Sequence, residues 1–259
     1  CIRDRLLTVA GLTGCFLFTS CRSAQETTAR YEISKVEGNM ITIDSTWDAN
    51  PDKKATTVLK PYKDKVDAMM YEVIGTSEMK MDKGTPESLL SNLVASVLQE
   101  AAAQVLGKPA DMGLVNMGGL RNILPKGDIT VGAVFEILPF ENSLCVLTMK
   151  GTDMKRLFKA IASLHGEGVS GIRLEINKKG ELLNATIGGK PVVDDQLYTV
   201  ATIDYLADGN GRMDAFLQAE KRECPEDATL RGLFLDYVRK QTAEGKIITS
   251  KLDGRITVK

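Results

Sequence analysis

The chain has 259 residues, of which 43% are hydrophobic and 26% are charged, so its composition is that of an ordinary folded protein. Its 33 Lys and Arg residues nearly balance 34 Asp and Glu residues, which excludes a nucleic-acid-binding field spread over the whole chain. His165 is the only histidine, and a single imidazole cannot build a His-rich dinuclear metal centre. We therefore expect no self-sufficient metallohydrolase site in this chain.

The first residues resemble an export signal. Two arginines precede an apolar run over residues 6–18, which is too short to span a bilayer as a helix. The small residues before Cys21 resemble the lipobox of bacterial lipoproteins, in which that cysteine carries the lipid. A short buried helix is the alternative interpretation. We expect a signal peptide with a lipobox over residues 1–21, a tether over 22–33, and a cell-envelope protein anchored by lipid to a bacterial membrane, periplasmic or surface-facing.

The first elements expected after the tether are a short strand and two helices. Residues 39–44 have strand character. Pro61 suits a first helical turn, and apolar residues at helical spacing follow it until Gly75. Thr85 is expected to cap the next helix, which Gly107 ends.

Beyond residue 107, strand and helix signals follow each other without a regular βαβ alternation. This mixed order predicts one compact α+β domain over residues 34–259, with mixed sheets flanked by helices. The remaining expected elements are strands at 113–116, 144–149, 172–176, 182–187, 198–203 and 255–258, a helix capped by Thr152, and a helix at 230–240.

Two cysteines lie in the expected domain, Cys145 and Cys224. In an oxidising envelope they can form a disulfide. The apolar neighbours of Cys145 are equally typical of a buried free thiol. The sequence leaves both states open.

Three short motifs combine residue types that suit a nucleotide. Asn116 opens an Asn-Met-Gly-Gly-Leu-Arg segment, in which the glycines allow close backbone approach and Arg121 offers a planar fork to oxyanions. Phe140 and Asn142 lie in one proline-stiffened turn, where the ring can stack on a base and the amide can read its edge. Tyr205 supplies a second ring at a strand end. Each motif alone is more typical of an ordinary turn or loop than of a ligand site.

In their order along the chain, these motifs, together with Gly-Asp-Ile-Thr at 127–130, resemble the C-terminal domain of 5′-nucleotidases, the family that includes the UDP-sugar hydrolases. The resemblance covers about residues 85–220. It implies a nucleotide-binding domain in which two rings stack on the base. In that family a separate N-terminal domain holds two metals and the catalytic groups, so the resemblance implies neither a catalytic residue nor a cofactor in this chain. The residues that it assigns to the nucleotide are Phe140, Asn142, Tyr205, Arg121, Gly171, Asn116 and Gly119.

The sequence departs from the family pattern at two positions. Gly211 stands where the family loop has an acidic residue that hydrogen-bonds the ligand, and Asp208 and Asp214 are the candidate replacements. Ser96 stands where the family helix normally carries an aspartate.

These features predict a nucleotide- or nucleoside-binding lipoprotein that presents substrate to a separately encoded metallophosphoesterase, which would hold the two divalent metals. The alternative is a surface scaffold or binding lipoprotein that kept the fold and lost nucleotide binding. A metal-independent hydrolase is disfavoured, because no nucleophile–base pair accompanies Asp204, Asp208 and Asp214. Whether the chain is an enzyme stays open at this point.

Overall fold

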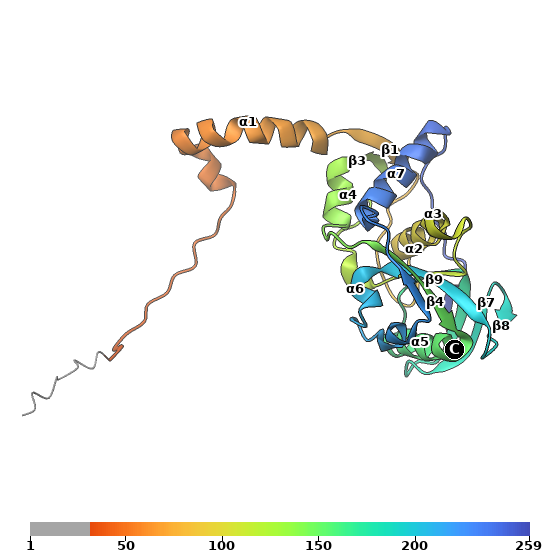
Figure 1. Cartoon of the computed structure of the whole chain (residues 1–259). Coiled ribbons are helices and arrows are strands. Elements are labelled where there is room, and N and C mark those ends of the chain that lie inside the picture. The colour runs from red at the N-terminus through yellow and green to blue at the C-terminus, as the bar shows by residue number, and fades with distance from the viewer. Residues whose placement is uncertain (1–31) are drawn as a thin grey trace, which may run out of the picture. The chain divides into compact units, whose positions relative to one another are not determined.

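The computed structural model describes residues 32–259, so the expected signal peptide, Cys21 and most of the tether lie outside it. The chain divides into two compact units at Pro51/Asp52. Figure 1 shows the helices and strands of the second unit. In the described part of the first unit, residues 39–44 form no strand, contrary to the prediction. Asp44 instead accepts the N–H of Thr46 and caps the 3-10 helix η1 (Ser45–Ala49).

Helices and strands are interspersed throughout the second unit. Its α-helices are α1 (Lys53–Met70), α2 (Leu89–Ala101), α3 (Ala103–Leu106), α4 (Val131–Ile137), α5 (Gly151–Ser163), α6 (Asp204–Ala207) and α7 (Leu230–Ala243), and its 3-10 helices are η2 (Met117–Gly119) and η3 (Asp214–Gln218). Its strands are β1 (Val73–Ser77), β2 (Met112–Val115), β3 (Gly127–Thr130), β4 (Leu144–Lys150), β5 (Gly168–Ser170), β6 (Ile172–Ile176), β7 (Leu182–Ile187), β8 (Lys190–Pro191), β9 (Leu197–Ile203), β10 (Lys221–Glu223) and β11 (Ile256–Val258). The predicted α+β class is confirmed.

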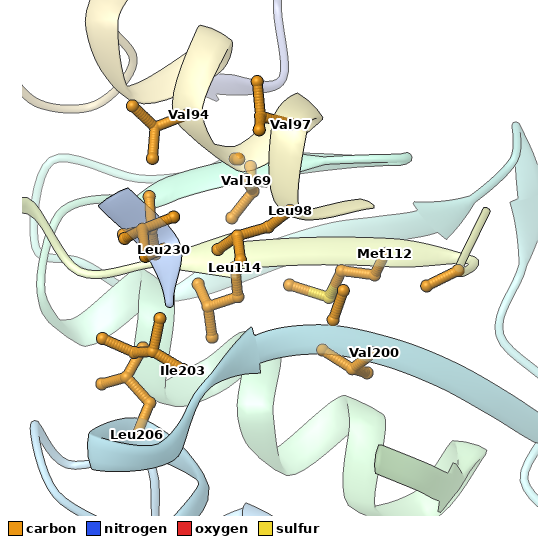
Figure 2. Packing of buried hydrophobic residues seen from close by; sticks show 14 of the residues in the cluster. Val94, Val97, Leu98, Met112, Leu114, Val169, Val200, Ile203, Leu206 and Leu230 are labelled. Atoms are coloured by element: carbon orange, nitrogen blue, oxygen red, sulfur yellow. The ribbon is translucent and has the colours of Figure 1, made fainter. Parts of the chain in front are cut away.

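The core lies on both faces of a five-stranded sheet of order β10-β4-β9-β2-β5. All residues of β2 and the first four of β4 are buried, which is the pattern of strands covered on both sides. α2 packs against β2 and β5, while α5 contacts both this sheet and the four-stranded sheet β11-β6-β7-β8. Figure 2 shows Val94 and Leu98 of α2 on one side of Leu114 of β2, and Val200 and Ile203 of β9 on its other side.

Strand register brings three loops to one end of this sheet. β4 runs antiparallel to β9 with Leu144 opposite Ile203, so the segment before β4 and the segment after β9 leave the sheet together. β2 runs parallel to β9 with Gly113 opposite Ala201, so the segment after β2 leaves at the same end. The three motifs singled out in the sequence occupy these three segments.

The start of α1 differs from the prediction. α1 begins at Lys53, and Pro61 lies inside it rather than in its first turn. The carboxylate of Asp52 accepts the N–H groups of Lys54 and Ala55 and so fixes the earlier start. Gly75 does not end this helix but lies in β1, where an added Cβ would be 2.6 Å from a side-chain atom of α7, so this glycine permits close packing.

The predicted caps of α2 and α5 are also wrong. Ser88, three residues after Thr85, caps α2 by accepting the N–H of Ser91. In α5 the helix already begins at Gly151, so Thr152 lies within it. A Cβ on Gly151 would come within 1.9 Å of a backbone carbonyl oxygen, so close backbone contact determines this helix start.

The two cysteines of the domain form a disulfide. Cys145 is fully buried in β4, and Cys224 directly follows β10, which pairs with β4. The structure therefore selects the disulfide over the free thiol, the two states that the sequence left open.

Candidate functional site

A cavity of about 330 Å³ opens where the three loops meet. Phe140 and Tyr205 line it, and these large aromatic side chains are 49% and 44% exposed. Apolar rings that stay uncovered in a concave site, beside convergent polar groups, are typical of ligand binding. The residues lining the cavity are Asn116, Gly118, Gly119, Phe140, Asn142 and Tyr205.

The aromatic loop before β4 is held by a buried arginine of α7. The Arg231 side chain is only 9% exposed, and its Nη1 donates to the carbonyl oxygens of Leu138 and Pro139 at 3.1 and 3.2 Å. Its Nη2 donates to the carboxylate of Glu141, and its guanidinium carbon lies 4.1 Å from the centre of the Phe135 ring. The backbone on both sides of the exposed ring is therefore fixed.

Removing this arginine is expected to loosen the aromatic loop. Arg231→Met leaves the carbonyl oxygens of Leu138 and Pro139 without their charged donor, so the free energy of unfolding should fall by about 2 kcal/mol. Urea denaturation measures this change. The matched control is Arg239→Met, also in α7, whose exposed pair with Glu72 contributes at most about 0.5 kcal/mol. Equal stability losses in the two variants would contradict the role of Arg231.

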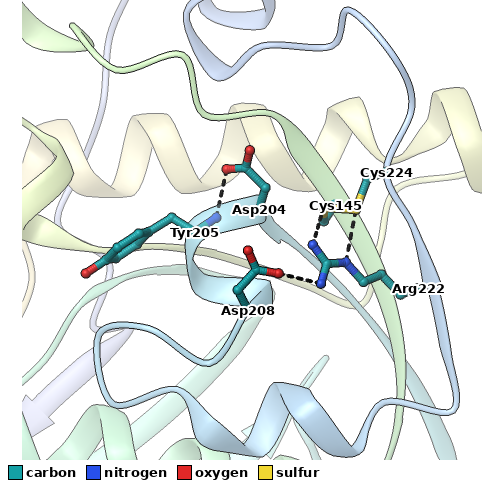
Figure 3. The surroundings of a disulfide bond; sticks show 6 residues. All are labelled: Cys145, Asp204, Tyr205, Asp208, Arg222 and Cys224. Atoms are coloured by element: carbon teal, nitrogen blue, oxygen red, sulfur yellow. Dashed lines mark hydrogen bonds and ion pairs between the residues drawn. A yellow bond between two sulfur atoms is a disulfide. The ribbon is translucent and has the colours of Figure 1, made fainter.

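The second ring is presented by a short helix at the end of β9. The carboxylate of Asp204 accepts the N–H of Tyr205 at 2.7 Å, at the first turn of α6. Leu206 and Ala207 of the same turn are buried, which anchors α6 and leaves the tyrosine ring outside the core. Figure 3 shows this ring pointing away from the disulfide.

The Gly-Gly turn after β2 carries an unpartnered amide. Oδ1 of Asn116 is buried and has no hydrogen-bond partner among the described residues. A Cβ on Gly119 would lie 3.0 Å from that oxygen, so the amide packs directly against this glycine. An unpaired buried acceptor costs about 1–3 kcal/mol, and such groups persist mainly where a ligand or water completes them.

Sequence reasoning missed Glu167, which supports this turn from the loop between α5 and β5. Its Oε2 accepts the N–H of Met117 at 2.5 Å. Burial raises the pKa of the Glu167 carboxyl to about 7, and the hydrogen bond from Met117 opposes that shift. No motif in the sequence marked this residue. Arg231 did leave a signal, because the buried Phe234 and Val238, three and seven residues later, place this charged residue on the apolar face of its helix.

Residues 73–218 match the family described as 5′-nucleotidase, C-terminal domain, and this is more than half of the chain. The chain belongs to this family. Among solved structures, the 5′-nucleotidase precursor from Thermus thermophilus superposes with a TM-score of 0.67 and 26% identity, over 82% of this chain and 44% of that one. The NAD nucleotidase of Haemophilus influenzae shares the fold, with a TM-score of 0.60, 19% identity, and coverage of 83% of this chain and 44% of that one.

Curated relatives extend the comparison. The trifunctional nucleotide phosphoesterase YfkN of Bacillus subtilis is 27% identical over 84% of this chain and 16% of its own length. The cell wall protein Lmo0130 of Listeria monocytogenes is 27% identical over 82% of this chain and 30% of its own length. The chain thus spans less than a third of the length of these two relatives.

In this 5′-nucleotidase C-terminal domain, two of the seven predicted site residues lie apart from the cavity. Arg121 is exposed and does not line it, although its Nη1 donates to the carbonyl oxygen of Gly118 at 3.3 Å. Gly171 lies in the turn between β5 and β6, packed against Asp111 and Gln99, and lines two neighbouring cavities instead. The expectation that Gly171 lines the pocket of the two rings is therefore corrected.

The loop after α6 supplies no acid to the cavity. Gly211 has a φ of +65°, and a Cβ there would lie 3.1 Å from Leu206. Asp208 is paired with Arg222 at 2.7 Å (Figure 3), and Asp214 is exposed in η3. Neither aspartate lines the cavity, so neither replaces the acid that the family pattern places at Gly211.

The metals of the family do not fit the residues of this domain. Across residues 32–259, no group of three or more His, Cys, Asp and Glu side chains is arranged to hold a metal ion. The groups that line the cavity are amides, aromatic rings and glycine backbone, which suit an organic ligand rather than a metal.

Proposed function

We propose that this domain binds the base of a nucleotide or nucleoside between Phe140 and Tyr205. The observation that carries the proposal is that these two half-exposed rings line one cavity together with the amides of Asn116 and Asn142. Aromatic rings stack on any base, and amides donate to and accept from base edges and sugar hydroxyls.

Each part of the cavity has a role in this proposal. The two rings hold the faces of the base, and the Asn142 amide reads its edge. The buried oxygen of the Asn116 amide has no partner among the described residues, so a small shift of this side chain lets it accept a hydrogen bond from the ligand. Gly118 and Gly119 leave the backbone open to the ligand. Arg121 is on the same turn and does not line the cavity; in this proposal its side chain leaves Gly118 and binds the charged end of a nucleotide.

The proposed role of the ligand site is to present substrate to a metallophosphoesterase carried by a separate chain. Two findings support a nucleotide-hydrolysing context: the family assignment, and relatives named as a nucleotide phosphoesterase and a 5′-nucleotidase precursor. Hydrolysis in this scheme needs metals that polarise the phosphate and activate water. In this scheme the domain binds the substrate and the separate chain carries out the hydrolysis.

The proposed location is the bacterial cell envelope, with a lipid anchor at Cys21. The lipobox-like segment supports the anchor, and a relative named as a cell wall protein supports the envelope. Replacing Cys21 would remove the anchor without touching the domain.

A second candidate function is a binding or scaffold lipoprotein that no longer takes nucleotides. The observation in its favour is the missing acid at Gly211, since Asp208 is occupied by Arg222 and Asp214 lies outside the cavity. The same binding experiment separates the two candidates.

Calorimetric titration of the protein with adenosine, AMP and UDP-glucose tests the proposal. We expect saturable binding of one ligand per chain, and tighter binding of AMP than of adenosine, by a few-fold, if Arg121 meets the phosphate. No release of phosphate is expected with added Mg²⁺ or Mn²⁺. The absence of binding to all three ligands, by protein shown to be folded, would contradict the proposal and favour the scaffold.

A further inference from the structure

The turn that carries Asn116 is held from two sides by side chains of opposite charge. On one side, Oε2 of Glu167 accepts the N–H of Met117 at 2.5 Å. On the other side, Nζ of Lys83 donates to the carbonyl oxygen of Leu120 at 2.5 Å and lies 3.5 Å from that of Met117. Both contacts join distant segments of the chain to the backbone of η2, directly beside the glycine pair.

Neither charged side chain lines the cavity, so neither is placed to touch a ligand there. Glu167 is partly buried, and no ion pair neutralises it within residues 32–259. Burying an unpaired carboxylate destabilises a fold. Such a group is expected where it holds a neighbouring segment in a required geometry, and here that segment is the turn bearing Asn116, Gly118 and Gly119.

We propose that Glu167 and Lys83 are positioning residues of the nucleotide pocket, which clamp the backbone of η2 so that Asn116 and the two glycines face the ligand. This inference rests on the proposed function. It deepens that function, because it assigns the geometry of the amide wall to two residues outside the pocket.

The clamp makes ligand binding depend on pH. Because burial raises the pKa of Glu167 to about 7, its carboxyl gains charge between pH 6 and pH 8. A carboxylate accepts a hydrogen bond more strongly than a carboxylic acid, so the clamp tightens as the pH rises. The shift has two causes, burial and the opposing hydrogen bond from Met117, and no charged side chain contributes to it. Affinity should therefore increase with pH in the wild type.

The experiment compares ligand affinity at pH 6 and pH 8 for the whole chain and four variants, using whichever of adenosine, AMP or UDP-glucose the wild type binds most tightly. At pH 8 we expect about ten-fold weaker binding in Glu167→Ala and in Lys83→Met. Glu167→Gln keeps a neutral acceptor, so it should recover most of the affinity and lose the pH dependence. Glu181→Ala, at an exposed turn, is the matched control and should bind like the wild type.

Hydrogen exchange of the Met117 amide provides a second readout, which needs no ligand. Faster exchange in Glu167→Ala, without a matching change in α2 or β9, supports the clamp. Wild-type affinity in Glu167→Ala and Lys83→Met, or a Glu167→Gln profile that follows pH as steeply as the wild type with the same ligand, would overturn it while leaving the proposed function intact. Failure of the wild type to bind any of the three ligands would contradict the proposed function, and this inference with it.

Discussion

Replacing both Phe140 and Tyr205 by Ala is expected to weaken nucleotide binding by at least about 100-fold, because base–aromatic stacking contributes about 1–3 kcal/mol per base. The two rings line one cavity and belong to segments that strand register brings together, so they act on the same ligand. Each single variant should lose about ten-fold. Titration calorimetry with the ligand that the wild type prefers measures all three affinities.

The matched control removes two aromatic rings that are also exposed but lie at α1 and its C-terminal end, and that do not line the cavity. Tyr62 is in α1, Tyr71 directly follows it, and their side chains are 69% and 73% exposed. The Tyr62→Ala, Tyr71→Ala double variant should bind like the wild type. The unfolding temperature of the Phe140/Tyr205 double variant should stay close to that of the wild type, because exposed rings contribute little to the core. Binding within about three-fold of the wild type by the folded double variant would exclude the aromatic pair as the site of the base.

The strands with clear hydrophobic patterns and the start of α7 at Leu230 were predictable from sequence, and the starts of α1, α2 and α5 were not. The strands at 172–176 and 182–187 coincide with β6 and β7. Two signals, Pro61 and Asp52, competed for the start of α1. Asp52 determined it, because its carboxylate accepts two backbone N–H groups of the first turn. Gly75 inside β1 and Gly151 at the start of α5 are both explained by close contact with segments far along the chain. Contacts of that kind leave no local pattern.

The candidate site also contains residues that the sequence predicts and residues that it does not. Phe140, Asn142, Tyr205, Asn116 and Gly119 lie in recognisable local motifs, and the structure brings all five to one cavity.

The residues that support the site from outside the cavity were not predicted from the sequence. Glu167, Lys83 and Arg231 act by hydrogen bonds to backbone groups of other segments, so only the three-dimensional structure identifies them. Gly171 shows the reverse error, since the resemblance placed it at the ligand while the turn after β5 carries it into other cavities.

Removing the disulfide is expected to lower the free energy of unfolding by about 4 kcal/mol in a Cys145→Ala, Cys224→Ala variant, because the bond closes a long loop in the unfolded chain. The two cysteines are separated by 79 residues, a span that includes α5, β9 and α6. Domains are typically stable by only about 5–15 kcal/mol, so a loss of this size should be plain in urea denaturation. Wild-type protein in a reducing buffer should show the same loss.

The Cys145→Ala, Cys224→Ala variant also shows whether the disulfide stabilises the protein only by restricting the unfolded chain or also by holding the ligand site in place. In the folded protein, Nε of Arg222 lies 3.3 Å from Sγ of Cys224, and its Nη1 pairs with Asp208 just after α6 (Figure 3). If the disulfide acts mainly through chain entropy, stability falls while Arg222 keeps its pair with Asp208 and ligand affinity stays within about two-fold. A parallel loss of affinity, matched by Arg222→Met with the cysteines intact, would show that the disulfide also holds the Tyr205 helix in place. Alkylation of both Cys145 and Cys224 in oxidised, unfolded wild-type protein, located by peptide mapping, would contradict the bond itself.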